Sequence, residues 1–156
     1  MTPEIDGKVV VWADDRSGDA DIYGYDLATN REFPICTAPG GQWRPEISGN
    51  IVVWDDERAG EGNADIYGYD LATNREFPIC TAGGNQSTPV ISGNIVVWED
   101  ARNGWNNTDI RACDLGSKRE SVICAAKGRR VARRSLATSS YGTTAGMVSS
   151  TYTAPC

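Results

Sequence analysis

The chain repeats itself at intervals of 44 residues, and this repeat limits its possible folds more than any other feature. The aspartates Asp21, Asp65 and Asp109 and the cysteines Cys36, Cys80 and Cys124 recur at this spacing. The tryptophans Trp12, Trp54 and Trp98 are spaced 42 and 44, so one turn varies in length by two residues. The stretch DIYGYDLATNREFPICTA occurs twice without change, at 21–38 and 65–82. A period of this length indicates one structural unit per repeat, stacked on its neighbours.

Each repeat contains four short segments with the composition of β-strands. In the second repeat these are Glu46–Ser48, Ile51–Trp54, Asp65–Leu71 and Arg75–Cys80. Four strands in about 40–45 residues are typical of a propeller blade. We therefore predict an all-β propeller with three four-stranded antiparallel blades at 3–38, 45–82 and 89–124. Pro34, inside the last segment of the first repeat, favours an outer edge strand because proline cannot donate a ladder hydrogen bond.

The motif P-x-I-S-G-N-I-V-V-W, followed by D-I-Y-G-Y-D-L, allows a narrower assignment than a generic propeller. Over 3–124 the chain resembles the TolB/WD40-like propeller repeats of bacterial and archaeal cell-surface proteins. Gly49-Asn50 and Gly93-Asn94 stand where that family usually has a P-D-G turn. The resemblance implies a propeller fold, a binding or scaffolding role and an extracellular or cell-surface location, and it carries over no catalytic residue.

Residues 125–156 break the repeat, and the genetic code offers an explanation. If codons are read from the third base of each tail codon, each shifted codon has two fixed bases. The options from the junction of Ala132 and Arg133 onward permit P-A-I-S-G-N-I-V-V-W. The shifted codon at the junction of Tyr141 and Gly142 permits the tryptophan that ends this motif. We interpret the tail as an out-of-frame fourth blade, which sequencing of the parent gene would test.

The charge distribution argues against nucleic acid as a partner. The formal net charge is −6, and the last 32 residues hold five basic residues and no acidic one, so the blades carry the whole acidic excess. Such a surface repels nucleic acid and anionic membranes. The basic tail cluster, Arg129 to Arg134, follows from GC-rich codons read out of frame. No apolar run reaches transmembrane length, so no membrane insertion is expected, and no signal peptide follows Met1.

Neither the cysteines nor the carboxylates predict a cofactor. Cys36, Cys80 and Cys124 are one position repeated, so we expect buried free thiols, and the chain has no histidine for a zinc site. The acidic clusters recur in every blade, whereas an active site needs one asymmetric set, so no catalytic residue is predicted. We expect turn and ion-pair roles, with Arg16–Asp21, Arg58–Asp65 and Arg102–Asp109 as the pairs. Calcium on these acidic turns is the alternative.

The tryptophans divide into two groups. Trp12, Trp54 and Trp98 end the most apolar segment of each repeat, so we expect them to pack between blades. Trp43, expected in the loop between blades, and Trp105, expected in a turn, are less repeated. They are the candidates for a binding surface, because tryptophan often dominates such surfaces.

Three blades are fewer than the four to eight of known propellers, so two sheet faces need covering. We expect a non-enzymatic interaction or structural module that self-associates, two chains giving a ring of six blades, or about eight if the tail adds strands. The alternatives are a glycan-binding, lectin-like propeller and a degenerate hydrolase-type propeller. A glycan array and a glycosidase screen would separate them.

Overall fold

The computed structural model describes residues 2–125, which form twelve β-strands and, within this range, no helix. The strands make three four-stranded sheets, each from four strands consecutive in the chain, and all pairings are antiparallel. The predicted all-β class with three four-stranded blades is confirmed. The interpretation of the tail as a fourth blade read out of frame concerns residues outside this range.

Each sheet corresponds to one sequence repeat and is called a blade below. Blade one contains β1 (Glu4–Asp6), β2 (Val9–Asp14), β3 (Asp21–Asp26) and β4 (Arg31–Cys36). Blade two contains β5 (Gln42–Ser48), β6 (Ile51–Asp56), β7 (Asp65–Asp70) and β8 (Arg75–Cys80). Blade three contains β9 (Gln86–Ser92), β10 (Ile95–Asp100), β11 (Asp109–Asp114) and β12 (Arg119–Cys124).

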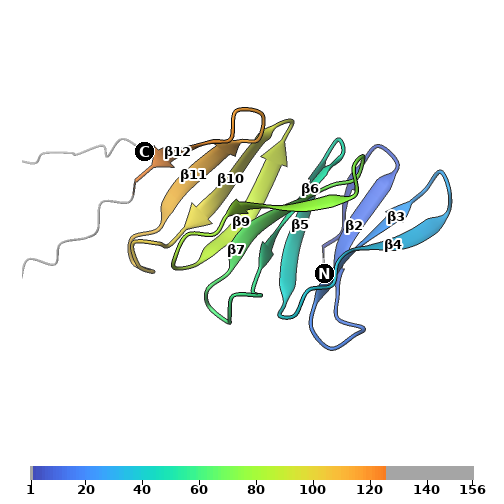
Figure 1. The fold of residues 1–156 in the computed structure, drawn as a ribbon, viewed down its shortest axis with the longest axis horizontal. Coiled ribbons are helices and arrows are strands. Elements are labelled where there is room, and N and C mark those ends of the chain that lie inside the picture. Colours follow the sequence, from blue (N-terminus) through green and yellow to red (C-terminus); the bar gives the residue numbers. More distant parts are fainter. Residues whose placement is uncertain (1, 126–156) are drawn as a thin grey trace, which may run out of the picture.

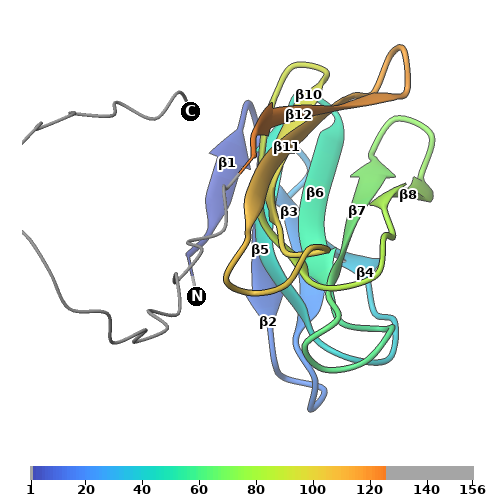
Figure 2. The same cartoon turned by 90° about the vertical axis from the view of Figure 1, so that its left-hand side faces the viewer.

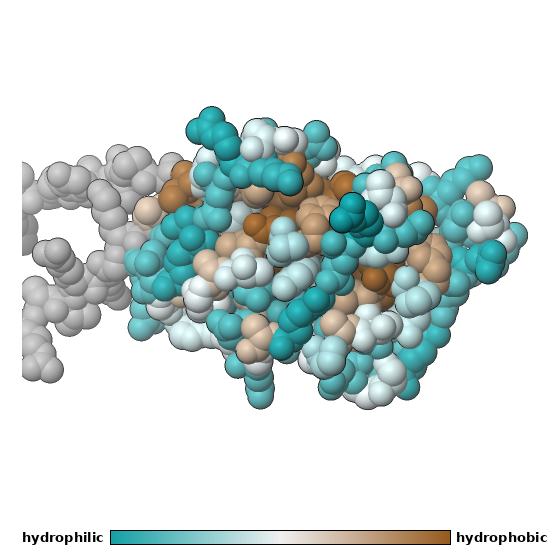
Figure 3. All heavy atoms as spheres, in the orientation of Figure 1, coloured by the Kyte–Doolittle hydropathy of each residue, from teal (hydrophilic) through white to brown (hydrophobic). Residues whose placement is uncertain are grey.

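The blades stand next to one another with their first strands on a common side. β5 packs against both β1 and β9, and the fourth strand of every blade lies at the opposite, outer edge, as Pro34 predicts. Figure 1 shows blades three, two and one following one another along the longest axis. From the end of that axis, in Figure 2, they overlap one behind the other. On the face shown in Figure 3, hydrophobic residues reach the surface in its middle part, with hydrophilic residues around them.

Two hydrophobic clusters fill the two junctions between blades. At the first junction Trp54 and Val52 of blade two pack with Val11, Ile22 and Ile35 of blade one. At the second junction Trp98 and Val96 of blade three pack in the same way with Val53, Ile66 and Cys80 of blade two. The predicted packing of these tryptophans between blades is therefore confirmed for Trp54 and Trp98, which are almost completely buried.

A glycine in the third strand of blades one and two is required by the neighbouring phenylalanine. A Cβ atom on Gly24 would lie 2.7 Å from Cζ of Phe33, and one on Gly68 would lie 2.8 Å from Cζ of Phe77. Blade three has Ala112 at this position, and Ser121 replaces the phenylalanine. The extra methyl group is accommodated because the large ring opposite it is absent. Blade three has thus diverged in contacting pairs.

Candidate functional site

Each blade has two faces, which take different parts in the junctions. We call the face that carries the repeated tryptophan the leading face, and the opposite face, which packs against the next blade, the trailing face. The leading faces of blades two and three are covered by the preceding blade. Within residues 2–125 no blade covers the leading face of blade one or the trailing face of blade three. These two open faces form the candidate site.

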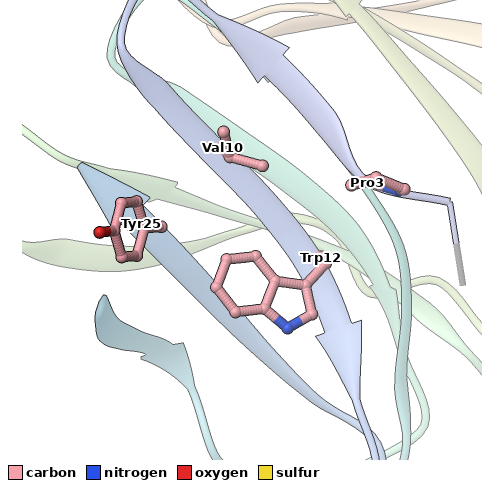
Figure 4. A pocket seen from close by; sticks show the side chains of 4 residues that line it. All are labelled: Pro3, Val10, Trp12 and Tyr25. Atoms are coloured by element: carbon pink, nitrogen blue, oxygen red, sulfur yellow. The ribbon is translucent and has the colours of Figure 1, made fainter. Parts of the chain in front are cut away.

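The open leading face of blade one is apolar. Pro3, Val10, Trp12 and Tyr25 line a shallow hollow of about 400 Å³, and Figure 4 shows these side chains around it. Val10 and Trp12 occupy the positions that Val52 and Trp54 hold in blade two, because β2 pairs with β3 in the same register as β6 pairs with β7. Trp12 is only partly buried, so its expected packing between blades is not completed within the described residues.

The open trailing face of blade three lies at the other end of the molecule. Ile95 and Ile123 are 43% and 59% exposed and line a shallow hollow together with Ala112 and Ser121. The corresponding residues of blade two, Ile51 and Ile79, pack against the second hydrophobic cluster. An apolar strand surface that is covered at one junction is therefore exposed here.

A polar cluster accompanies each tryptophan and ties neighbouring blades together. In blade two, Trp54 Nε1 donates to Asp56 Oδ2 at 2.9 Å, and Arg58 donates to both oxygens of the same carboxylate. Arg58 also donates to Glu76 at 2.7 Å and lies 4.0 Å above the centre of the Tyr67 ring. Its Nη2 contacts Cys36 Sγ of blade one at 3.3 Å. The hydrogen bonds that Arg58 donates to Asp56, and then the one to Glu76, raise the pKa of Arg58 above its usual value.

Blades one and three carry corresponding polar clusters, but in blade three Arg111 takes the place of the tyrosine and pairs with Glu120. Arg102 pairs with Asp100 and Glu120 and reaches Cys80 Sγ at 3.2 Å, whereas Arg16 pairs with Asp14 and Glu32 at the open face. The ion pairs that the sequence suggested, with Asp21, Asp65 and Asp109, are therefore wrong. The arginines instead pair with the aspartate two residues earlier, because that carboxylate also accepts their own backbone N–H. Asp21 accepts from Ser17, and Asp109 accepts from Asn103.

A separate ion pair, between buried Asp55 and the exposed side chain of Arg44, lies next to the second junction. Asp55 is 1% exposed, and the Nε and Nη2 atoms of Arg44 donate to its two oxygens at 2.9 and 2.7 Å. Arg44 adopts a φ of 51°, which accompanies a shift of register between β5 and β6. Burial raises the pKa of Asp55 to about 6, although the hydrogen bonds from Arg44 oppose this shift.

Raising the pH from about 4 to about 6 is expected to remove stability through Asp55. Its pKa in the folded chain lies above its ordinary value of 3.8, so in this window the folded chain binds more protons than the unfolded chain, and the free energy of unfolding falls as the pH rises. The loss from this residue is on the order of 3 kcal/mol. Urea unfolding between pH 4 and pH 7 should show it when wild type is compared with Asp55→Asn, whose side chain does not titrate. A stability difference between the two proteins that stays constant over this range would contradict the assignment.

The cysteines largely follow the sequence expectation. Cys36, Cys80 and Cys113 are free and buried, and burial raises the pKa of Cys36 to about 12, which leaves its thiol protonated at neutral pH. Cys124 is disulfide-bonded, so the prediction of a free thiol is wrong there. Among residues 2–125 no group of three or more acidic, cysteine or histidine side chains is arranged to hold a metal ion.

Trp43 and Trp105, the predicted binding residues, are exposed by 41% and 70%. Trp43 was expected in a loop, and this is wrong: it lies in β5, opposite Asp55, and its Nε1 donates to Glu57 at 3.4 Å. The strand starts earlier than expected because the irregularity at Arg44 allows the pairing with β6 to resume before Glu46. Trp105 lies between β10 and β11, in the expected turn. A binding role for either residue stays a prediction.

The fold defines the chain as part of a β-propeller, because three similar four-stranded blades stand side by side with their first strands together. No protein-family model and no curated protein matches the sequence. The described part contains no helix long and apolar enough to cross a membrane.

Comparison with solved structures finds β-propellers of the TolB type and others. TolB from Acinetobacter baumannii superposes with a TM-score of 0.63 at 18% identity, over 79% of this chain and 32% of that one. The β-propeller domain of the Trilobed protease from Pyrococcus furiosus, described as having an open velcro topology, gives 0.61 at 17% identity, over 78% and 42%. A puromycin-hydrolyzing peptidase from Mycobacterium tuberculosis gives 0.63 at 18%, over 85% and 22%. The chain thus spans between about a fifth and under half of these proteins, and the likeness shows the propeller fold.

Proposed function

We propose that this chain is a non-enzymatic propeller module that completes its ring with a second copy of itself. The observation that carries the proposal is the match between its two open faces. The open leading face of blade one carries Val10, Trp12 and Tyr25, where blade two presents Val52, Trp54 and Tyr69 to its neighbour. The open trailing face of blade three presents Ile95 and Ile123, where blade two presents Ile51 and Ile79.

The internal junctions serve as templates for the contact between copies. Blade one of a second chain would pack on blade three of the first through the same kinds of side chain that already pack twice within one chain. Covering Trp12, Ile95 and Ile123 removes apolar surface from water, which stabilises association by about 25 cal/mol per Å² before the costs of association. Two such head-to-tail contacts close a ring of six blades with two-fold symmetry, provided that the rotation per blade permits closure.

Light scattering behind size exclusion tests this proposal on the full chain. We expect one discrete particle with twice the mass of the chain. Trp12→Arg places a charge on the open leading face and is expected to give a monomer, because an unpaired charge cannot be buried cheaply. Trp105→Arg, at an exposed tryptophan outside both faces, is the matched control and should leave the dimer intact. A monomeric wild type, or a Trp12→Arg dimer as stable as the control, would refute self-association.

The absence of an enzymatic role rests on the repetition of the polar clusters. The same aspartate, arginine and glutamate recur in blades one, two and three, where they hold the tryptophans and the blades in place. The extracellular or cell-surface location is proposed from the resemblance of the repeat to propellers of surface proteins. A glycan array with Trp43→Ala and Trp105→Ala as controls would reveal the lectin-like alternative.

A further inference from the structure

The ring proposal leaves unused a groove between blades two and three. It has a volume of about 720 Å³ and lies within a single chain, so it exists whether or not two chains associate. Its apolar wall consists of Ile51, Phe77, Ile79, Cys113 and Leu115. Its remaining lining is polar and includes side chains of both charges.

At the first junction, between blades one and two, side chains fill the position that is equivalent to this groove. There Val9, Phe33, Ile35 and Leu71 pack in one cluster that includes Tyr69. Their counterparts one repeat later are Ile51, Phe77, Ile79 and Leu115, and the counterpart of Tyr69 is Cys113. The register confirms the equivalence, since Tyr69 lies opposite Val52 and Cys113 lies opposite Val96.

The exchange of tyrosine for cysteine removes a phenol ring from the second junction. Phe33 packs in the first cluster, whereas Phe77 lines the groove and does not belong to the second cluster. The space is therefore not closed by the neighbouring side chains. Enclosed apolar cavities with room for a ring bind aromatic molecules, and the apolar wall of this groove offers one side of such a site.

The polar rim favours a particular substituent on such a ring. The hydroxyl of Tyr69 lies 3.5 Å from Asn74 Oδ1, and the counterpart of Asn74 in blade three is Lys118, which lines the groove. Asp70 and Glu76 line it as well, with Arg75 beside them. A rim with both charges suits a neutral group that can donate and accept a hydrogen bond, and a phenolic hydroxyl does both.

We propose that the groove between blades two and three binds a small phenolic ligand. Its ring takes the place that the Tyr69 ring holds at the first junction, against Phe77 and Leu115. Its hydroxyl faces the rim formed by Lys118 and Asp70. Cys113 determines this site, because a tyrosine there would fill it from within the chain.

Titration of the full, isotopically labelled chain with p-cresol, which corresponds to the isolated side chain of tyrosine, tests the proposal by NMR. We expect saturable shifts in the millimolar range at the amides of Phe77, Cys113 and Leu115. Toluene, which lacks the hydroxyl, should bind more weakly at the same residues. Absence of saturable shifts in the wild type, or shifts confined to the open leading face around Trp12, would overturn the proposal.

Two reciprocal variants sharpen the test. Cys113→Tyr restores the residue of the first junction and is expected to abolish the shifts at Phe77 and Leu115. Tyr69→Cys should open an equivalent groove between blades one and two and add a second set of shifts at Phe33 and Leu71. Unchanged p-cresol binding in a folded Cys113→Tyr chain would refute the site. If Cys113→Tyr does not fold, the wild-type titration and the second set of shifts expected in Tyr69→Cys still test the proposed site.

Discussion

Replacing Trp54 with alanine is expected to lower the free energy of unfolding by about 3–5 kcal/mol, enough to unfold a marginally stable domain. Trp54 is completely buried between blades one and two, in a cluster that includes Val11 and Ile22 of blade one. Its removal leaves a cavity that the close-packed sheets cannot collapse to fill, and it takes a hydrogen-bond donor away from buried Asp56. Urea unfolding followed by circular dichroism measures the loss.

Trp12→Ala is the matched control, because Trp12 holds the same position on the open leading face. In protein dilute enough to be monomeric, this variant should lose far less stability than Trp54→Ala, since the ring has no preceding blade against it within the described residues. Equal losses in the two variants would mean that the leading face of blade one is covered in the monomer. That result would also remove the basis of the ring proposal.

Asp56→Ala is expected to destabilise the chain by about 3–5 kcal/mol, because it leaves a partly buried guanidinium without its main partner. The Asp56 carboxylate is fully buried and accepts hydrogen bonds from Trp54 and from the backbone and side chain of Arg58. Without it, Arg58 retains Glu76 and the face of Tyr67, both of which are more exposed. Thermal unfolding with and without the substitution measures the effect.

Two comparisons test the origin of that loss. Asp14→Ala removes the corresponding carboxylate in blade one, where Arg16 is open to solvent, and should cost no more than the ~1 kcal/mol of a surface ion pair. The double variant Asp56→Ala/Arg58→Met removes both charges and should recover part of the stability lost in Asp56→Ala. A double variant less stable than the single one would show that the arginine contributes through other contacts.

Much of the fold could be predicted because the same strand pattern recurs in three successive repeats. The strand periodicity and the repeated tryptophan agree in every copy, the outer-edge proline recurs in two of the three, and a period near 44 leaves few alternatives to a blade. The ion pairs were predicted wrongly because spacing alone does not show which acid an arginine meets. The arginines pair with Asp14, Asp56 and Asp100 because each of these carboxylates also accepts the backbone N–H of the arginine two residues later.

The groove between blades two and three could not be predicted from the sequence for a related reason. Cys113 could be seen in the sequence as a substitute for Tyr69, but its consequence depends on which side chains surround it across the junction. That set comes from two different blades and includes Phe77 and Leu115, 38 residues apart in the chain. Likewise, the burial of Asp55 depends on β9 packing against β6 from the next blade.

The sequence by itself determined the blades: their number, their strands and the residues that face a neighbour, because periodic apolar patterns are local and repeat in register. Only the tertiary structure decided which copies of those residues are covered. Trp54 and Trp98 are buried and Trp12 is not, although all three lie in the same local sequence, since burial depends on whether a blade precedes them in space. The two open faces and the groove are therefore properties of how the blades stack.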